Sequence, residues 1–177
     1  MPISRLPSRN DEGAVLVVIE SPRGSALKLK YDPQLDAMLL SRPLPAGVVY
    51  PHDWGFIPST HASDGDPLDA IVLWDGSSYP GVVIPCRLLG VLNVEQTNLG
   101  SGARERNDRI VAVPIESTEA RTMRSVFDIP QRGRQELERF FLNAVAFRGK
   151  DLRILGWAGC DEAEALVSAA AEALAAR

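Results

Sequence analysis

The sequence predicts a single α+β domain that is mainly β, a small barrel with helices packed on its outside. Three observations support this fold class. Short apolar or alternating runs broken by Gly and Pro fill most of the chain, and helical spacing of apolar residues is confined to the last part. The 177 residues suffice for one well-buried domain and not comfortably for two. Residues 1–12 are polar and contain prolines, so we expect a flexible arm there.

The expected strands are marked by β-branched or alternating residues between turn signals. The run 14–20 is β-branched and ends at Ser21-Pro22, which indicates a strand followed by a turn. The run 26–32 alternates apolar and polar residues, as a half-buried strand does. Further strands are expected at 38–40, 48–50, 70–73, 81–94 and 109–113.

Helices are expected after the strands. A short one can begin at 117–120, and Pro130 stands near the first turn of the next. In that second helix apolar residues recur at helical spacing, namely Leu137, Phe140, Phe141, Ala144 and Val145. The last helix opens with acidic residues at 161–164, favourably placed at a helix N-terminus, and runs through Leu174.

Composition narrows the class of protein. Hydrophobic residues make up 45%, charged residues 24%, and the net charge is −4, which describes a soluble globular protein and argues against nucleic acid as a partner. No apolar run approaches the roughly 18 residues of a membrane span, and the first residues lack a signal-peptide pattern, so we expect a cytoplasmic protein with no membrane partner. Cys86 and Cys160 are expected to be reduced. Two histidines argue against a His-rich zinc site or a Ser-His-Asp triad.

The most informative segment is the acidic loop, which we define as residues 62–69. It places Asp64, Asp66 and Asp69 just before an apolar run. Carboxylates this close repel one another unless a cation lies between them, and Mg²⁺ or Mn²⁺ prefers such oxygen ligands. The alternative is ordinary turn chemistry, in which Asp side chains cap local N–H groups. Three carboxylates at this spacing favour the metal site.

Basic residues accompany the acidic loop. Lys28 and Lys30 are two apart on an expected strand and therefore face the same way. With Arg42 and Arg109 they could face the carboxylates, and this combination is typical of phosphoryl transfer. The alternative is that each is a solvated surface charge. The chain contains neither a P-loop motif nor a dinucleotide-binding glycine motif.

Together these residues resemble the soluble family I inorganic pyrophosphatases. The specific match is the metal-aspartate motif, present here as Asp64-Gly65-Asp66-Pro67-Leu68-Asp69. Further matches lie in the segments 18–22, 50–51, 54–58, 86–92, 110–114, 140–141 and 156–157. The resemblance covers roughly residues 14 to 175. It implies a five-stranded OB-like barrel with flanking C-terminal helices, Mg²⁺-dependent hydrolysis of pyrophosphate, and a homo-oligomer.

The resemblance also implies roles for individual residues. Its implied metal ligands are Glu20, Asp64, Asp66, Asp69 and Asp108, the last by a one-residue slip from the family's aspartate. Asp66 would also help to deprotonate water. The implied substrate-binding residues are Lys28, Arg42, Trp54 at a family tyrosine, and Arg109 at a family lysine.

Several positions depart from the family pattern. Lys30 stands at a family glutamate, Glu95-Gln96 at an aspartate, and Asn107 at the aspartate that Asp108 could replace. Ala144-Val145 replaces a Tyr-Lys pair, for which Phe147-Arg148 could partly substitute, and an insertion occupies 97–106. Two alternatives therefore stay open: a relative that hydrolyses another phosphoanhydride or a phosphate ester, and a non-catalytic metal-binding relative.

Overall fold

The structure is a computed structural model that describes residues 2–176. Its strands are β1 (Val15–Ser21), β2 (Leu27–Asp32), β3 (Ala37–Pro43), β4 (Asp53–Phe56), β5 (Asp69–Val72), β6 (Val83–Thr97), β7 (Arg104–Arg106), β8 (Arg109–Pro114) and β9 (Arg153–Ala158). Its α-helices are α1 (Glu119–Thr122), α2 (Gln131–Ala144) and α3 (Cys160–Ala175), and short 3₁₀ turns occupy Ile3–Arg5 and Val126–Asp128.

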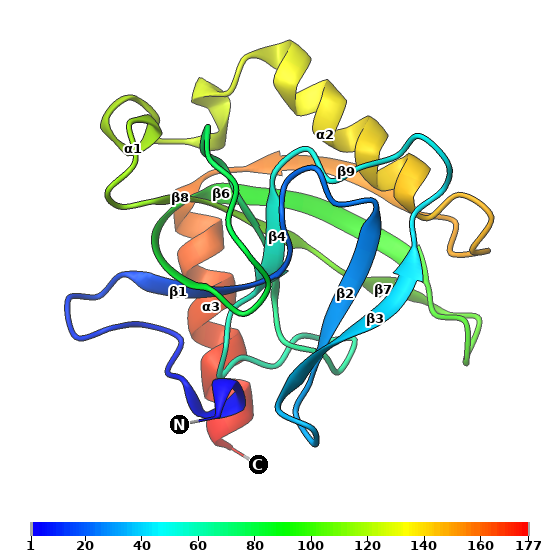
Figure 1. Ribbon diagram of the computed structural model, residues 1–177, viewed down its shortest axis with the longest axis horizontal. Coiled ribbons are helices and arrows are strands. Elements are labelled where there is room, and N and C mark those ends of the chain that lie inside the picture. The colour runs from blue at the N-terminus through cyan, green and yellow to red at the C-terminus, as the bar shows by residue number, and fades with distance from the viewer. Residues whose placement is uncertain (1, 177) are drawn as a thin grey trace.

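Five strands close into a barrel (Figure 1). The order is β1-β4-β5-β8-β6, and β6 pairs with β1 again to complete the circle. β5 and β8 are parallel, whereas the other four barrel pairs are antiparallel. β7 and β9 pair with the end of β6 and extend the sheet beyond the barrel. The predicted mainly β fold, an OB-like five-stranded barrel with C-terminal helices, is confirmed.

The long strand β6 makes this closure possible because it bends at Gly90. Its register against β8 shifts between Leu88 and Gly90, which marks a bulge. Gly90 has a φ of 151°, and a Cβ there would lie 2.2 Å from the carbonyl oxygen of Ala158. Only glycine therefore lets β9 approach β6 so closely at the bend.

Two helices cover the barrel on different sides (Figure 1). α2 buries Leu137, Phe140, Phe141 and Ala144 in a core cluster with Trp54 and Leu92. α3 buries Ala163, Val167 and Ala170 in a second cluster built on β1, β5 and β8. Four of the five apolar residues expected at helical spacing thus form the buried face of α2, and the fifth, Val145, follows the end of the helix and is half-buried.

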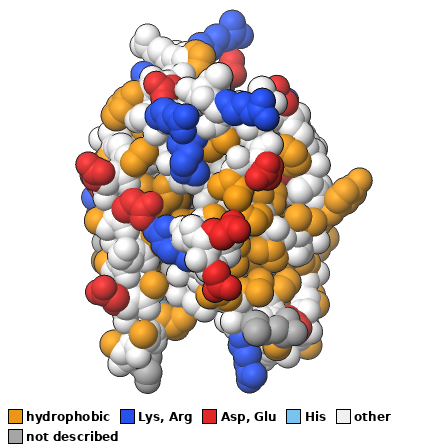
Figure 2. Space-filling view, turned by 90° about the vertical axis from the view of Figure 1, so that its left-hand side faces the viewer, with side chains coloured by type: hydrophobic (Ala, Val, Ile, Leu, Met, Phe, Trp, Pro, Cys, Tyr) orange, Lys and Arg blue, Asp and Glu red, His pale blue; other side chains and the backbone are white. Residues whose placement is uncertain are grey.

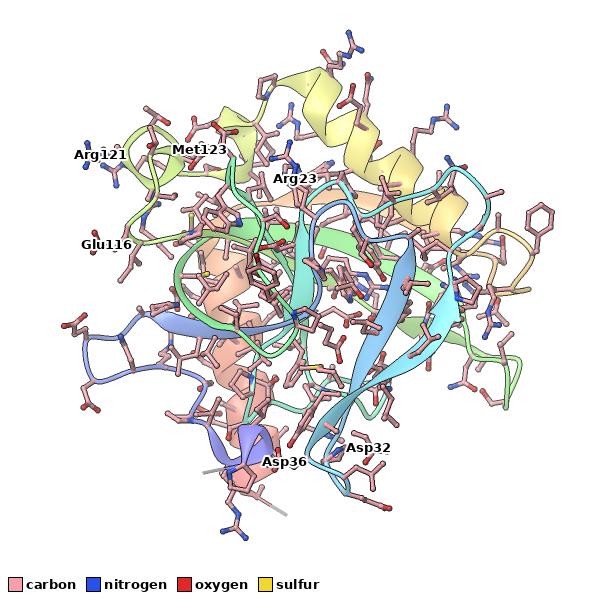
Figure 3. The ribbon with its side chains drawn as sticks, in the orientation of Figure 1. Arg23, Asp32, Asp36, Glu116, Arg121 and Met123 are labelled. Carbon is pink, nitrogen blue, oxygen red and sulfur yellow. The ribbon has the colours of Figure 1, made fainter. Side chains whose placement is uncertain are left out.

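A separate two-stranded hairpin, β2 with β3, projects beside the barrel. Figure 3 shows its turn, where Asp32 and Asp36 are labelled. The Asp32 carboxylate accepts hydrogen bonds from the backbone N–H groups of residues 34 and 35, and Asp36 has a φ of 49°. The Tyr31 hydroxyl donates to Asp36 at 2.7 Å. These local bonds hold the hairpin that carries Lys28 and Lys30.

The segment expected to be a flexible arm lies against the barrel in its described part, residues 2–12. Ile3 and Leu6 pack on the cluster around Val18, and Ser4 donates its backbone N–H to the Tyr31 hydroxyl. The Arg9 side chain forms an ion pair with Glu164 of α3, and the Arg9 backbone forms an isolated β-bridge with Val15. Met1 lies outside the described residues.

One expected strand, 48–50, does not form. The backbone N–H of Val48 bonds to Pro45 and that of Tyr50 bonds to Ser25, so this segment belongs to a loop, and the next strand begins at Asp53. The sequence patterns also did not predict the strands β4, β7 and β9. The remaining expected strands and all three helices are present within about three residues of their expected bounds.

The surface and the cysteines agree with the composition. On the face that Figure 2 shows, acidic and basic side chains lie among apolar ones, so this face presents both signs of charge. Cys86 and Cys160 are both free, and burial raises the pKa of the Cys86 thiol. Within residues 2–176 no helix is both long and apolar enough to cross a bilayer.

Candidate active site

The acidic loop is shaped by its own backbone bonds. The N–H of Ala62 donates to the carbonyl of Asp66 at 2.8 Å, and the N–H of Gly65 donates back to Ala62 at 3.1 Å. Gly65 has a φ of 92°, a conformation that favours glycine. The tight turn directs Asp64 and Asp66 towards the same space as Asp69, the first residue of β5.

That space is a cavity of about 630 Å³ between the barrel, the β2–β3 hairpin and the loop after α2. Its acidic lining residues are Glu20, Asp64, Asp66, Asp69 and Glu105. Its lysines and arginines are Lys28, Lys30, Arg42, Arg109, Arg148 and Lys150. The cavity therefore joins the acidic loop and the basic residues of the sequence, as their pattern predicted.

Glu20 reaches the cavity from β1, where the register against β4 shifts between Ile19 and Ser21. Such a bulge re-aims a side chain. Glu20 is buried, its carboxylate accepts a hydrogen bond from the Tyr31 backbone N–H at 2.8 Å, and burial raises its pKa to about 7. The nearby negative charge of Asp69 acts in the same direction as burial, and the hydrogen bond from Tyr31 opposes both. A cation in the cavity would relieve both effects.

Burial and neighbouring negative charges also act on the carboxyl of Asp64. Burial raises the pKa of its carboxyl, and the charges of Asp69 and Asp66 act in the same direction. The donor set of carboxylates fits a hard divalent cation, because repulsion among them is what such an ion removes. Within residues 2–176, however, no three Asp, Glu, His or Cys side chains already converge as a closed ligand cage.

Two of the carboxylates are instead paired with cations of the chain itself. Lys30 Nζ lies 2.8 Å from Asp66 Oδ2, and the Arg109 guanidinium is paired with Asp69. The parallel register of β5 and β8 places Arg109 directly beside Asp69. Burial lowers the pKa of Lys30, but the hydrogen bond and the charge of Asp66 outweigh it, so the pKa is raised. Burial lowers the pKa of Lys28.

Arg109 is the most firmly held cation in the cavity. It is 5% exposed, and its guanidinium carbon lies 5.2 Å from the Trp54 ring and 5.7 Å from the Phe141 ring. Asn107 accepts a further hydrogen bond from it. Rings on the guanidinium faces add cation–π attraction and limit its movement.

Trp54 does not line the cavity. It is 4% exposed and belongs to the core cluster under α2, and its indole N–H has no hydrogen-bond partner among residues 2–176. Its contact with the site is the one with Arg109. The expected direct contact of Trp54 with substrate is therefore replaced by support of Arg109.

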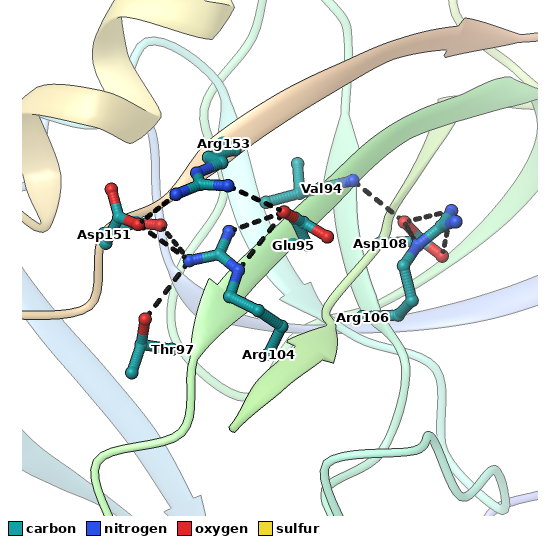
Figure 4. A network of polar contacts seen from close by, with 8 residues as sticks. All are labelled: Val94, Glu95, Thr97, Arg104, Arg106, Asp108, Asp151 and Arg153. Atoms are coloured by element: carbon teal, nitrogen blue, oxygen red, sulfur yellow. Dashed lines mark hydrogen bonds and ion pairs between the residues drawn. The ribbon is translucent and has the colours of Figure 1, made fainter. Parts of the chain in front are cut away.

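Asp108 also lies away from the cavity. Its carboxylate accepts the backbone N–H of Val94 at 2.9 Å and forms an ion pair with Arg106 at 2.8 Å (Figure 4). Successive residues of an extended segment point to opposite sides, so Asn107 and Arg109 face the cavity and Asp108 does not. Asp108 therefore does not take the place of the family's aspartate at the cavity, and Asn107 faces the cavity instead.

Glu95 and Gln96, which stand at another aspartate of the family pattern, also point to opposite sides of their strand. Gln96 lines the cavity and donates to Glu105 at 3.1 Å. Glu95 points to the other side of β6, where it pairs with Arg104 and Arg153 (Figure 4). At the position of the family aspartate the cavity is therefore faced by an amide.

The loop after α2 supplies two cations to the cavity, of which the family resemblance predicts Arg148 as a partial substitute for the family's Tyr-Lys pair. Arg148 and Lys150 line the cavity, whereas Phe147 is 98% exposed. Arg42 donates to the carbonyl oxygen of Ala144 at 2.9 Å, which ties β3 to the end of α2. No local signal marks Lys150, because its approach to the cavity depends on how α2 docks on the barrel.

A cavity that presents carboxylates for a hard cation beside Lys and Arg for an anion is the arrangement of a phosphoryl-transfer enzyme. Residues 17–175 match the family of inorganic pyrophosphatases. The chain belongs to the inorganic pyrophosphatase family.

Individual relatives agree over nearly the whole chain. A protein of Nostoc sp. named inorganic pyrophosphatase is 36% identical over 167 residues, 94% of this chain and 95% of its own. One from Thermus thermophilus is 40% identical over 146 residues, 81% of this chain and 80% of its own.

Solved structures agree as well. The crystal structure of the Thermus thermophilus inorganic pyrophosphatase has a TM-score of 0.90 at 35% identity and covers 99% of both chains. That of an inorganic pyrophosphatase from Neisseria gonorrhoeae has a TM-score of 0.86 at 26% identity, over 98% of this chain and 99% of that one.

Proposed function

We propose that this chain hydrolyses inorganic pyrophosphate to two phosphates in the cavity of the acidic loop, with Mg²⁺ as its divalent cation. The activity follows from family membership over residues 17–175. The observation that carries its location is the convergence of Asp64, Asp66 and Asp69 with six Lys and Arg side chains around one cavity.

Four carboxylates would hold the metal: Glu20, Asp64, Asp66 and Asp69. A divalent cation there supplies charge neutralisation for phosphate oxygens and makes water a stronger acid. Mn²⁺ has the same oxygen preference and could replace Mg²⁺. Asp108 is not part of this set because it does not line the cavity.

The chain's own residues would bind the anion and move the proton. Lys28, Arg42 and Arg109 present cationic N–H donors to the phosphate oxygens, and Arg109 is held rigid by Trp54 and Phe141. Asp66, on the exposed turn of the acidic loop, accepts a proton from the attacking water. Positioning and charge neutralisation account for most of the catalysis in phosphoryl transfer.

The test is phosphate release from pyrophosphate with Mg²⁺ by wild type, Asp66→Asn and Asp108→Asn. We expect Asp66→Asn to lose activity by a factor of about 10² or more, as loss of a general base does. Asp108→Asn is the matched control, since its carboxylate faces away and an amide oxygen still accepts the Val94 N–H. No release above background with Mg²⁺, Mn²⁺, Co²⁺ or Zn²⁺ would refute the proposal.

A second candidate is hydrolysis of a larger phosphoanhydride or a phosphate ester. It is favoured by the size of the cavity, about 630 Å³, which is within the range of sites for drug-sized ligands. Val145 at the cavity wall adds no polar group there. A substrate panel separates the two, because a clear preference for pyrophosphate argues against the larger substrate. Metal binding without turnover of any substrate would identify a non-catalytic relative.

Assembly and location are further proposals. We expect a homo-oligomer, as the family resemblance implies, and a cytoplasmic location, as the sequence patterns predict. Sedimentation velocity of the purified chain tests the first expectation, and a single species at the mass of one chain would contradict it. A fluorescent fusion followed by cell fractionation tests the second.

A further inference from the structure

Asp66 already has a cation beside it before any metal binds. The Lys30 ammonium lies 2.8 Å from Asp66 Oδ2 and donates a hydrogen bond to it. Lys30 comes from the β2–β3 hairpin and Asp66 from the acidic loop, so two segments meet through this pair. Lys30 is therefore already bonded to one of the carboxylate oxygens that we propose as metal ligands.

The two cations paired with the loop differ in how firmly they are held. The Arg109 side chain is 7% exposed and lies against two aromatic rings, so it cannot leave Asp69 without disrupting the core. The side chains of Lys30 and Asp66 are 50% and 56% exposed. Exposed ion pairs are weak and break readily. The ammonium of Lys30 can therefore move away when a stronger ligand arrives.

The net charge of the cavity lining also indicates that the chain itself supplies cations to this site. Its lining holds five carboxylates and six Lys or Arg side chains, so among the described residues the lining carries an excess of one positive charge when all are ionised. A site that needs several metal ions would present an excess of carboxylates instead. Part of the positive charge that a polyanion requires here comes from the chain.

We propose that Lys30 is a built-in competitor for divalent metal at Asp66. Its ammonium substitutes for one cation in the metal-free site, and metal binds Asp66 only when Lys30 leaves. The released ammonium then stays at the cavity, where it can contact an oxygen of the anionic substrate. This role rests on the proposed function, since it concerns the metal and the substrate of the same site.

The direct test is metal affinity without substrate, measured by titration calorimetry with Mg²⁺ and by Mn²⁺ electron paramagnetic resonance. Lys30→Gln removes the charge and keeps a side chain of similar length. We expect its Kd for metal to fall roughly tenfold, from loss of the competing pair and of repulsion between ammonium and dication. In the Asp66→Asn background the same substitution should change Kd less than about twofold.

Lys150→Gln is the matched control. Lys150 lines the same cavity and its charge reaches Asp64 and Asp69, but Asp66 forms its ion pair with Lys30. If Lys30→Gln and Lys150→Gln tighten metal binding equally, general charge is responsible and the competitor role is refuted. An unchanged Kd in Lys30→Gln, or no metal binding by that variant at all, refutes it too.

The outcome separates this role from the proposed function. Tighter metal binding in Lys30→Gln that requires Asp66 supports the competitor role even when no variant releases phosphate, a result that would refute the hydrolase. Pyrophosphate turnover by wild type with equal Kd in wild type and Lys30→Gln supports the hydrolase and refutes the competitor role.

Discussion

The buried carboxyl of Glu20 makes the free energy of unfolding depend on pH. The carboxyl is 6% exposed, and burial raises its pKa from 4.5 to about 7 in the folded protein. A group whose folded pKa is raised binds more protons in the folded state between these two values. Its contribution to stability is therefore fully present below pH 4.5 and is lost as pH rises through about 7.

The magnitude follows from the two pKa values. A separation of about 2.5 pH units corresponds to about 3 kcal/mol of unfolding free energy. Glu20→Gln removes the titration, and its amide oxygen can still accept the Tyr31 N–H. Relative to wild type, the variant should therefore gain up to about 3 kcal/mol of stability between pH 4.5 and pH 8 in the metal-free protein.

The assay is urea unfolding of both proteins in a chelator, followed by tryptophan fluorescence at several pH values. The difference in unfolding free energy between variant and wild type should grow with pH, because only wild type must ionise a buried carboxyl. Added Mg²⁺ should then stabilise wild type more than Glu20→Gln at pH 8. A difference that stays constant from pH 4.5 to pH 8 refutes the assignment of a raised pKa to Glu20.

Three further predictions concern the frame of the site and are checked by urea unfolding. Gly55→Ala should cost at least about 3 kcal/mol, because its Cβ would lie 1.8 Å from the Val18 carbonyl oxygen. Arg109→Gln should cost about 3–5 kcal/mol in metal-free protein by leaving Asp69 without its cation, and Mg²⁺ should restore part of the loss. Arg153→Gln, whose side chain is 60% exposed, should cost less than about 1 kcal/mol; equal losses in all three would contradict this ranking.

The parts of the site that could be predicted are those with a local signal. Asp64, Asp66 and Asp69 share one short turn, so their convergence follows from the sequence around Gly65. Lys28 and Lys30 share a face because a strand repeats every two residues, and both line the cavity. Short-range geometry of this kind needs no knowledge of the rest of the chain.

The parts that could not be predicted depend on contacts between distant segments. Asp108 has the right chemistry for a metal ligand, but the pairing of Asp69 with Arg109 across β5 and β8 fixes which residues of β8 face the cavity. Trp54 matched a substrate-binding position, yet its ring packs under Arg109 and Phe141. Strand register and side-chain packing are tertiary effects that sequence patterns do not encode.

The fold of this chain and the charge of its cavity depend on different sets of residues. At 26% identity a solved pyrophosphatase still superposes with a TM-score of 0.86, because the buried faces of barrel and helices determine the fold. The cavity lining is free to change without loss of the fold. In this chain it carries Lys30, Gln96 and Asn107 at positions where the family pattern has carboxylates. Each of these three substitutions makes the cavity less negative, so we expect fewer metal ions to be needed to neutralise a bound polyanion.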